Sequence, residues 1–90
     1  MRLDWDEEKA RRNLAKHGVS FQEAATVLGD TLGWTYPDAL HSMYEQRWIT
    51  IGMSEQDRLL VVAHSEEGET MRIISAREAT RKERRFYEER

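Results

Sequence analysis

The architecture of this chain turns on its C-terminal segment, which reads Arg72-Ile73-Ile74-Ser75-Ala76-Arg77-Glu78-Ala79-Thr80-Arg81-Lys82-Glu83-Arg84-Arg85-Phe86-Tyr87. The β-branched pair Ile73 and Ile74 is typical of a strand. Ser75 follows at once and Glu78 lies three residues further on, which is the spacing of a capping box at a helix start. The segment therefore predicts a strand that runs directly into a helix beginning at Ser75.

The predicted helix has two distinctive faces. By three-and-four spacing, Glu83 falls on the same face as Ala79 and Phe86, so its carboxylate turns inward and needs a partner or a chemical use. The adjacent face gathers a row of guanidiniums, namely Arg77, Arg81, Arg84 and Arg85. Such a row suits phosphates, because arginine presents a planar fork of donors. The same pattern also describes a solvated helix held together by Glu–Arg pairs.

Composition limits the class of protein. A chain of 90 residues, 39% hydrophobic and 34% charged, forms one globular domain over residues 1–90 with a small core. The absence of cysteine excludes disulfides, thiol catalysis and Cys-based zinc sites. The longest apolar run is residues 59–63, and the N-terminus lacks a signal-peptide core, so we expect a soluble, cytoplasmic protein without a membrane segment.

The charge is unevenly distributed along the chain. The net charge of −3 argues against a general nucleic-acid coat. Residues 1–45 hold 5 Lys+Arg and 8 Asp+Glu, whereas residues 46–90 hold 9 of each. The basic groups of the second half can therefore still cluster into a local anion-binding surface.

The N-terminal half predicts a short strand and two helices. Residues 3–5 alternate as a strand does, and Asp6 offers an N-cap for a helix over residues 7–17 that ends at Gly18. A second capping box begins another helix at Ser20, and its apolar face is expected to be core.

The second half predicts a sheet. Residues 31–36 contain a glycine and precede Pro37, which is typical of an edge strand. Strands over residues 47–53, 58–65 and 69–75 follow with linkers short enough for antiparallel hairpins. The middle one is apolar on both sides and is expected to be central. The fold class is therefore α+β, with a strand, two helices, a four-stranded antiparallel meander and a C-terminal helix.

The residues also resemble a known family. Its specific motifs are Lys-His-Gly before Ser-Phe, and Arg-Ile-Ile-Ser-Ala-Arg before Glu-Arg and Tyr. The matching positions span nearly the whole chain and are Trp5-Asp6, Lys9, Asn13, Lys16-His17-Gly18, Ser20-Phe21, Ala24-Ala25, Glu45, Arg47, Gly52, Leu60-Val61-Val62, Arg72-Ile73-Ile74-Ser75-Ala76-Arg77, Ala79, Glu83-Arg84 and Tyr87. In these residues the chain is similar to the BrnT family.

The resemblance implies a RelE-like fold and a ribonuclease toxin of a type II toxin–antitoxin pair. It implies an RNA substrate and a BrnA-like antitoxin with a ribbon-helix-helix domain, so that DNA is contacted only through the antitoxin. Glu7 stands where the family often has proline, which concerns the entry to the first helix. The acidic total differs from the basic surface of many RelE-type toxins and argues against ribosome-dependent cleavage more than against cleavage of free RNA.

RNA cleavage by this fold type would use the 2′-hydroxyl as an internal nucleophile, and that scheme requires no metal or cofactor. The enzyme must remove the hydroxyl proton, stabilise charge on phosphorus and protonate the leaving 5′-oxygen. We expect the phosphate clamp to be Arg72, Arg77 and Arg47, with RNA attraction from Arg81 and Arg84. The candidate bases are Glu45 and Glu83, and the candidate acids are His64 and Tyr87.

Each assignment has a structural alternative. Glu83 also fits a purely structural pairing with Arg72 or Arg77. Glu45 and Arg47 fit a surface ion pair, and His64 at the end of a core strand fits a structural role. Further histidine and amide side chains fit local roles: Asn13 and His17 are expected to tie the first helix to backbone, and His41 to be solvated.

Two other classes of function compete with the nuclease. A non-catalytic module could bind a protein partner through the edge strand Thr31–Tyr36 and the acidic first half. A metal hydrolase is poorly supported, because the three histidines lie 24 and 23 residues apart (41 − 17 and 64 − 41) without paired ligand spacing. For the toxin, an antitoxin segment rich in carboxylates is expected to cover the arginine row.

Overall fold

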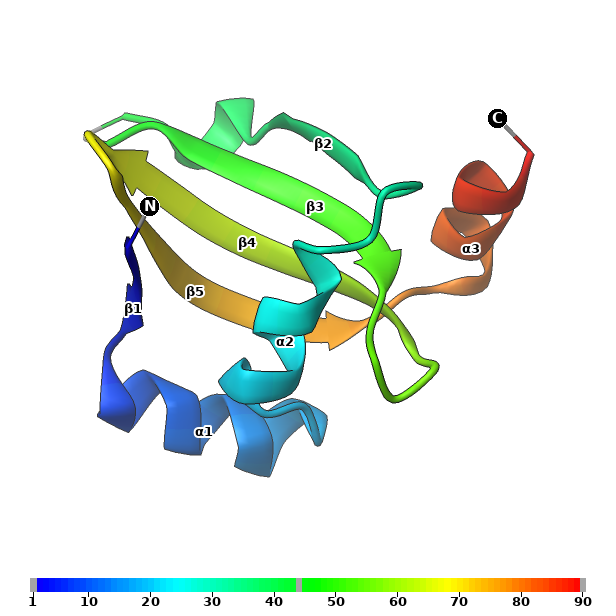
Figure 1. Cartoon of the computed structure of the whole chain (residues 1–90), viewed down its shortest axis with the longest axis horizontal. Coiled ribbons are helices and arrows are strands. Elements are labelled where there is room, and N and C mark those ends of the chain that lie inside the picture. The colour runs from blue at the N-terminus through cyan, green and yellow to red at the C-terminus, as the bar shows by residue number, and fades with distance from the viewer. Residues whose placement is uncertain (1, 44, 90) are drawn as a thin grey trace.

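The computed structural model describes residues 2–43 and 45–89, and in that part of the chain five strands form one mixed sheet (Figure 1). The elements, in chain order, are β1 (Arg2–Trp5), α1 (Glu7–His17), α2 (Phe21–Val27), β2 (Trp34–Pro37), a short 3-10 turn (Ala39–His41), β3 (Arg47–Met53), β4 (Leu59–Glu67), β5 (Thr70–Glu78) and α3 (Arg81–Glu88). The sheet order is β1-β5-β4-β3-β2. The predicted α+β class, with its meander and C-terminal helix, is confirmed.

The sequence predicted a first strand but not its partner. β1 lies along β5 in parallel, with Trp5 opposite Ile73, while β2, β3, β4 and β5 pair antiparallel in succession. β4 is the middle strand and is buried over most of its length. Its two-sided apolar pattern had predicted that central position.

The N-terminal helix caps are those expected from the sequence. The Asp6 side chain accepts hydrogen bonds from the amides of Glu8 (2.8 Å) and Lys9 (3.4 Å) at the start of α1. Gly18 ends the helix with φ of 69°, a left-handed conformation that glycine adopts without strain. Ser20 Oγ accepts from the Glu23 amide (3.0 Å) at the start of α2.

Only the hydroxyl half of that second capping box is present. Glu23, which is 4% exposed, turns its carboxylate away from Ser20 and toward the β3–β4 turn. There it accepts hydrogen bonds from Ser54 Oγ (2.8 Å) and Arg58 Nε (2.9 Å). The Arg58 pairing lowers the pKa of Glu23 despite its burial. A partly buried ion pair that the sequence did not reveal therefore joins α2 to the hairpin.

The predicted helix start at Ser75 was wrong. Ser75 lies within β5, opposite Ala63, and the strand continues to Glu78, which stands opposite Leu60. The helix begins only at Arg81, with Thr80 as its N-cap. The Thr80 hydroxyl accepts the Glu83 amide (3.2 Å) while Glu83 accepts the Thr80 amide (2.8 Å), so the true capping box lies five residues later.

The later start also breaks the predicted row of four guanidiniums, because Arg77 belongs to β5 and not to the helix. Two features hold the chain extended over this stretch. Pairing with β4 continues through Glu78, and Asn13 of α1 hydrogen-bonds the backbone of the buried Ala76, beyond the segment that β1 pairs. The Asn13 amide donates to the oxygens of Val19 (2.9 Å) and Ala76 (2.8 Å) and accepts from the Ala76 amide (3.1 Å). The predicted backbone role of Asn13 is confirmed.

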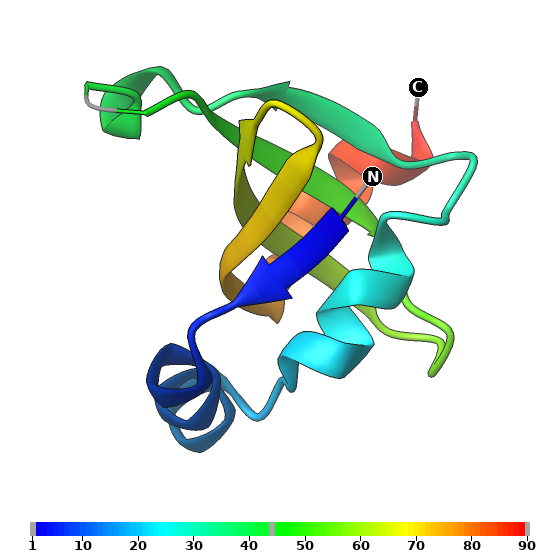
Figure 2. The same cartoon turned by 60° about the vertical axis from the view of Figure 1, so that its left-hand side comes forward.

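The two faces of the sheet have different neighbours. α1 and α2 cover one face through a cluster of buried apolar side chains, which are Val19, Phe21, Ala24, Val27, Leu60, Val62, Ile73 and Ala76. On the opposite face a smaller cluster of Ile51, Leu59 and Val61 packs against Ala79 and Tyr87, at the α3 end of the chain. Figure 2 shows α3 behind the sheet, on the side away from α1 and α2. We call this second side the open face, because α3 lies over only one end of it.

Within the described residues, none of the helices combines the length and apolarity that a membrane-spanning segment needs.

Candidate functional site

A β-bulge decides which arginines share the open face. The β4–β5 register shifts between Ala63 and His64, so that Ala63 stands opposite Ser75 but His64 stands opposite Ile73. Simple alternation would send Arg72 and Arg77 to opposite faces. The extra residue in β5 reverses that outcome, and both guanidiniums leave the sheet on the open face.

One group of polar side chains lies at the end of the open face far from α3. Ser65 of β4 stands between Arg47 of β3 and Arg72 of β5, and Asp4 of β1 stands opposite Arg72. Directly opposed residues share a face, so these four form a row across the sheet. Glu45 joins the row through a 3.1 Å contact from Arg47 Nε to its carboxylate. We call Glu45, Arg47, Ser65 and Arg72 the loop-end cluster.

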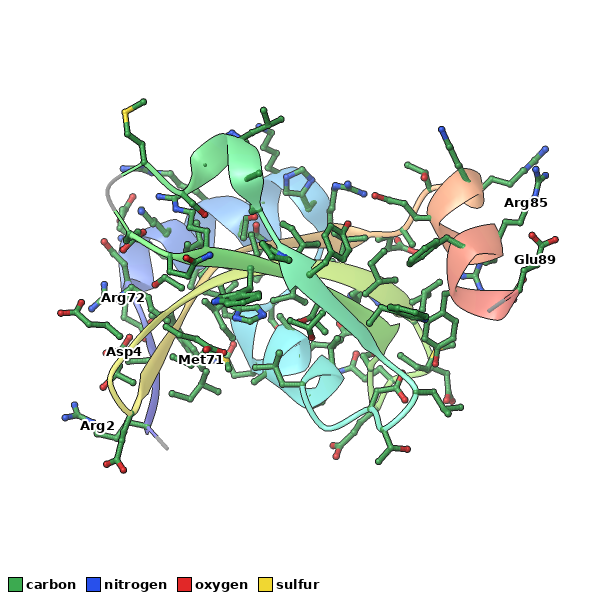
Figure 3. The ribbon with its side chains drawn as sticks, turned by 90° about the horizontal axis from the view of Figure 1, so that it is seen from above. Arg2, Asp4, Met71, Arg72, Arg85 and Glu89 are labelled. Carbon is green, nitrogen blue, oxygen red and sulfur yellow. The ribbon has the colours of Figure 1, made fainter. Side chains whose placement is uncertain are left out.

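The loop-end cluster is hollowed on both sides of Glu45. One cavity of about 270 Å³ is lined by Glu45, Ser65, Glu67, Thr70 and Arg72. A second of about 370 Å³ is lined by Leu40, His41, Met43, Glu45 and Arg47. Arg72 Nε lies 3.2 Å from Asp4 Oδ1, and Figure 3 shows the two together at the end of the molecule farthest from α3. Glu45 thus lines one cavity with Arg72 and the other with Arg47 and His41.

A second group lies where α3 meets the open face. Arg77 donates two hydrogen bonds to Glu83, from Nη1 at 2.7 Å and from Nη2 at 2.9 Å. Together with the Thr80 amide, this pairing lowers the pKa of Glu83 to about 2. The same contact raises the pKa of Arg77. Glu83 is therefore held ionised and is a weak proton acceptor at neutral pH.

Tyr36 of β2 completes this second group. Burial and then the Glu83 charge raise the pKa of its hydroxyl, which keeps the phenol protonated. We call Tyr36, Arg77 and Glu83 the helix-end cluster. The two clusters lie on one face but at a distance: Arg77 stands opposite Val61 and Arg72 opposite Ser65. Four residues of strand separate those positions by about 13 Å.

The structure therefore brings together only some of the predicted site residues. Arg47, Arg72 and Glu45 meet in the loop-end cluster, and Arg77 meets Glu83 in the helix-end cluster. The three arginines expected to clamp one phosphate fall into two groups, because Arg77 lies about 13 Å along the sheet from Arg72.

Both predicted acids are engaged elsewhere. His64 is 1% exposed and lies on the face covered by α1 and α2, where a 2.8 Å hydrogen bond joins its Nε2 to Thr50 Oγ1. Burial lowers its pKa, so it remains neutral. The Tyr87 hydroxyl donates to Asp30 Oδ2 at 2.7 Å and ties α3 to the end of α2. His64 therefore lies on the sheet face opposite both clusters.

The two predicted RNA-binding arginines lie on the surface of α3. Arg81 and Arg84 are exposed, and Arg84 lies 3.9 Å from Glu88 one turn further along the helix. They add positive charge on α3 beside the paired Arg77 and Glu83, and neither contributes to the loop-end cluster.

Sequence reasoning missed two candidate site residues. The sequence predicts Tyr36 only as the neighbour of Trp34 on an edge strand that could meet RNA or a partner. The i, i+2 spacing of the two is the signal that both rings share one face. His41 was read as a solvated loop residue. Its Nδ1 contacts the Asp38 carboxylate at 3.0 Å, a local Asp-x-x-His pairing that spacing alone does not establish. In the described part of the chain, no three acidic or histidine side chains gather as a metal site would need.

Comparison with known proteins places the chain at two levels, a class and a family. The class is that of a small α+β ribonuclease toxin of a type II toxin–antitoxin system. More narrowly, the chain belongs to the BrnT family, because residues 5–83 match the family model described as "Ribonuclease toxin, BrnT, of type II toxin-antitoxin system". The predicted family membership is confirmed.

Among solved structures, the chain is similar to the Brucella abortus ribonuclease toxin BrnT, with a TM-score of 0.70 and 27% sequence identity. The similarity covers 90% of this chain and 99% of that one. A search of curated proteins found no match.

Proposed function

We propose that this toxin cleaves RNA on its open face without a metal ion, by attack of the 2′-hydroxyl on the adjacent phosphate, as RelE-type ribonucleases do. The observation that carries the proposal is the loop-end cluster. Arg47 and Arg72 flank Ser65 on neighbouring strands, and Glu45 lies between the cavities that they line. A phosphodiester above Ser65 would meet a guanidinium on each side and a carboxylate beside it.

Each group has a chemical task. The Glu45 carboxylate takes the 2′-hydroxyl proton, and the oxygen attacks phosphorus to form a 2′,3′-cyclic phosphate. Arg47 and Arg72 stabilise the negative charge that grows on the phosphoryl oxygens. His41 gives a proton to the departing 5′-oxygen. Asp38 holds Nδ1 of His41 and leaves Nε2 available for that transfer.

The helix-end cluster has a different task in this scheme. Glu83 is a poor base because Arg77 holds its pKa at about 2. The pair instead fixes the guanidinium of Arg77, which keeps further N–H donors for a neighbouring phosphate of the same RNA strand. Glu83 is thus a positioning residue for Arg77.

The experiment that tests the proposed site substitutes one residue at a time and includes a matched control variant. We expect Arg72→Ala and Glu45→Gln each to lower RNA cleavage by about 100-fold or more, in line with the loss of a charge-stabilising group or a general base. Arg11→Ala is the control, because Arg11 is an exposed arginine of α1, paired only with Glu8 among the contacts of the described residues. Circular dichroism confirms folding, and growth arrest is scored in parallel. Folded Arg72→Ala protein with native activity would overturn the proposed site.

The proposal extends to the partner. A BrnA-like ribbon-helix-helix antitoxin would neutralise the toxin by laying an acidic segment over the open face, where Arg47, Arg72 and Arg77 all emerge. Charge complementarity of this kind makes the complex sensitive to salt. We expect the affinity to fall as salt is raised, measured by calorimetry on the purified pair. Affinity independent of salt would point instead to an apolar contact, such as one along the exposed edge strand β2.

A further inference from the structure

A cavity between β2 and α3 has a lining unlike that of the loop-end cluster. Its volume is about 480 Å³, and it is lined by Tyr36, Ile51, Lys82, Glu83 and Phe86. Three elements that are far apart in sequence supply these residues, namely β2, β3 and α3. The volume lies within the range of small-molecule sites. We call it the aromatic cavity.

Aromatic side chains form its walls and remain exposed. Tyr36 of β2 is 38% exposed, and Phe86 of α3 is 47% exposed. Trp34, also 38% exposed, lies behind Phe86 with ring centroids 5.4 Å apart and planes inclined by 53°. Three large rings left at the surface in one place are typical of a binding site, because a fold gains nothing from exposing them.

The charges beside the aromatic cavity favour an anionic ligand. Within the cavity lining, Glu83 is neutralised by its two hydrogen bonds to Arg77, which leaves the charge of Lys82 on the rim. The Asp38 carboxylate acts on Tyr36 from outside that lining. Arg81, the first residue of α3, directly precedes Lys82. An apolar slot between rings with cations at its edge is the arrangement that holds a base by stacking and its phosphate by charge.

We propose that the aromatic cavity holds a nucleobase of the RNA substrate, stacked between Tyr36 and Phe86. This inference rests on the proposed function, because it makes the cavity a second contact on a strand whose scissile phosphate lies at the loop-end cluster. Arg77 then binds a phosphate between the two sites. Purines fit better than pyrimidines, because their larger rings stack more strongly. The cavity therefore gives the toxin a sequence preference away from the cleaved bond.

The test measures binding apart from cleavage. Hexamers with 2′-O-methyl riboses lack the nucleophile and cannot be cleaved by 2′-hydroxyl attack. Fluorescence anisotropy of three end-labelled hexamers, oligo-A, oligo-U and a fully abasic one, gives the contribution of the bases. For the native protein we expect oligo-A to bind more tightly than oligo-U, and both to bind more tightly than the abasic hexamer by about 10-fold or more.

Single substitutions show which side chains of the protein bind the bases. Phe86→Ala and Tyr36→Leu remove exposed rings, so folding should be retained, and each should reduce the difference between oligo-A and the abasic hexamer to about twofold or less. Leu14→Ala is the matched control, because it deletes an exposed apolar side chain on α1, away from the open face. It should keep the full difference.

Two results would overturn the inference. The first is a base-dependent difference that is the same in Phe86→Ala as in the native protein. The second is Phe86→Ala protein that binds every hexamer as the native protein does but loses affinity for the antitoxin, which would make the cavity a protein-docking site. Native protein that prefers oligo-A through Phe86 yet never cleaves RNA would refute the proposed cleavage and leave the subsite standing.

Discussion

At the scale of the residue, Glu83 shows how environment decides between two roles that sequence leaves open. Its inward position predicted either a catalytic base or a structural partner. In the structure, two hydrogen bonds from Arg77 and one from the Thr80 amide surround its carboxylate. Such contacts favour the ionised form and make the group a weak base. The structural role is therefore the one that the geometry supports.

This environment makes Glu83 a source of acid sensitivity. Its pKa falls from an ordinary 4.5 to about 2 on folding, so its contribution to stability is complete above pH 4.5 and is lost as the pH falls toward 2. We expect Glu83→Gln to lower the free energy of unfolding at neutral pH. The difference from the native protein should then shrink between pH 4.5 and 2, measured by urea denaturation.

The control for that series is Glu88→Gln on the same helix. Glu88 makes only a 3.9 Å exposed ion pair with Arg84, which contributes little. A gap between native and Glu83→Gln protein that stays constant down to pH 2 would show that the Arg77 pairing does not stabilise the fold.

At the scale of the residue, the sequence correctly predicted contacts that follow from local spacing. It did not predict how deeply a side chain is buried. Asp6, Gly18 and Asn13 were assigned correctly, because a cap, a C-terminal glycine and an inward amide act on nearby backbone. The acid role for His64 assumed that a polar side chain at a strand end is accessible. The structure buries it against Thr50 on the other face.

At the scale of the element, the boundary between β5 and α3 was decided by tertiary pairing. Two Ser/Thr-x-x-Glu patterns follow one another, at residues 75–78 and 80–83. Local pattern does not choose between them. Pairing with β4 through Glu78 favours the extended chain over the first pattern, so the second one caps the helix.

A helix start at Ser75 and one at Thr80 predict opposite results when the hydroxyl group of each residue is removed. We expect Thr80→Ala to lower the free energy of unfolding by about 1 kcal/mol, because it removes the oxygen that accepts the Glu83 amide. Ser75→Ala should change it by less than about 0.5 kcal/mol, because Ser75 is an exposed strand residue. Denaturant unfolding of both variants measures this. The reverse order would restore the helix start at Ser75.

The β-bulge between β4 and β5 could not be predicted from the sequence. Strict alternation along β5 would place Arg72 and Arg77 on opposite faces. The register shift beside His64 instead moves Arg72 to the same face as Arg77. A one-residue change in register exchanges the two faces of a strand, and nothing in the β-branched run marks where it occurs.

At the scale of the whole molecule, the fold separates stability from chemistry by sheet face. The covered face holds the larger core against α1 and α2, and the partly buried Glu23–Arg58 pair joins α2 to the β3–β4 hairpin. The open face holds a smaller apolar cluster under α3 and leaves the rest of the sheet to polar side chains. Substrate could therefore be bound along a rigid sheet without disturbing the main core.

The distribution of charge follows the same division. A net charge of −3 is compatible with RNA binding because the guanidiniums of Arg47, Arg72 and Arg77 all emerge on the open face. A local field of this kind acts on a substrate within roughly a Debye length, about 8–10 Å at physiological salt. The order of strands and helices could be predicted from the sequence. The sequence also proposed that these three arginines act together, but their division into two groups about 13 Å apart could not be predicted, because it depends on strand register.

The most direct measurement is incubation of the purified toxin with naked RNA in a metal chelator, followed by identification of the new ends. Arg72→Ala protein, purified in the same way, controls for contaminating ribonuclease. The account predicts that cleavage persists in chelator and leaves 2′,3′-cyclic phosphate and 5′-hydroxyl ends, because the 2′-oxygen attacks and the 5′-oxygen departs with a proton. Loss of cleavage in chelator, or fragments with 3′-hydroxyl and 5′-phosphate ends, would contradict it.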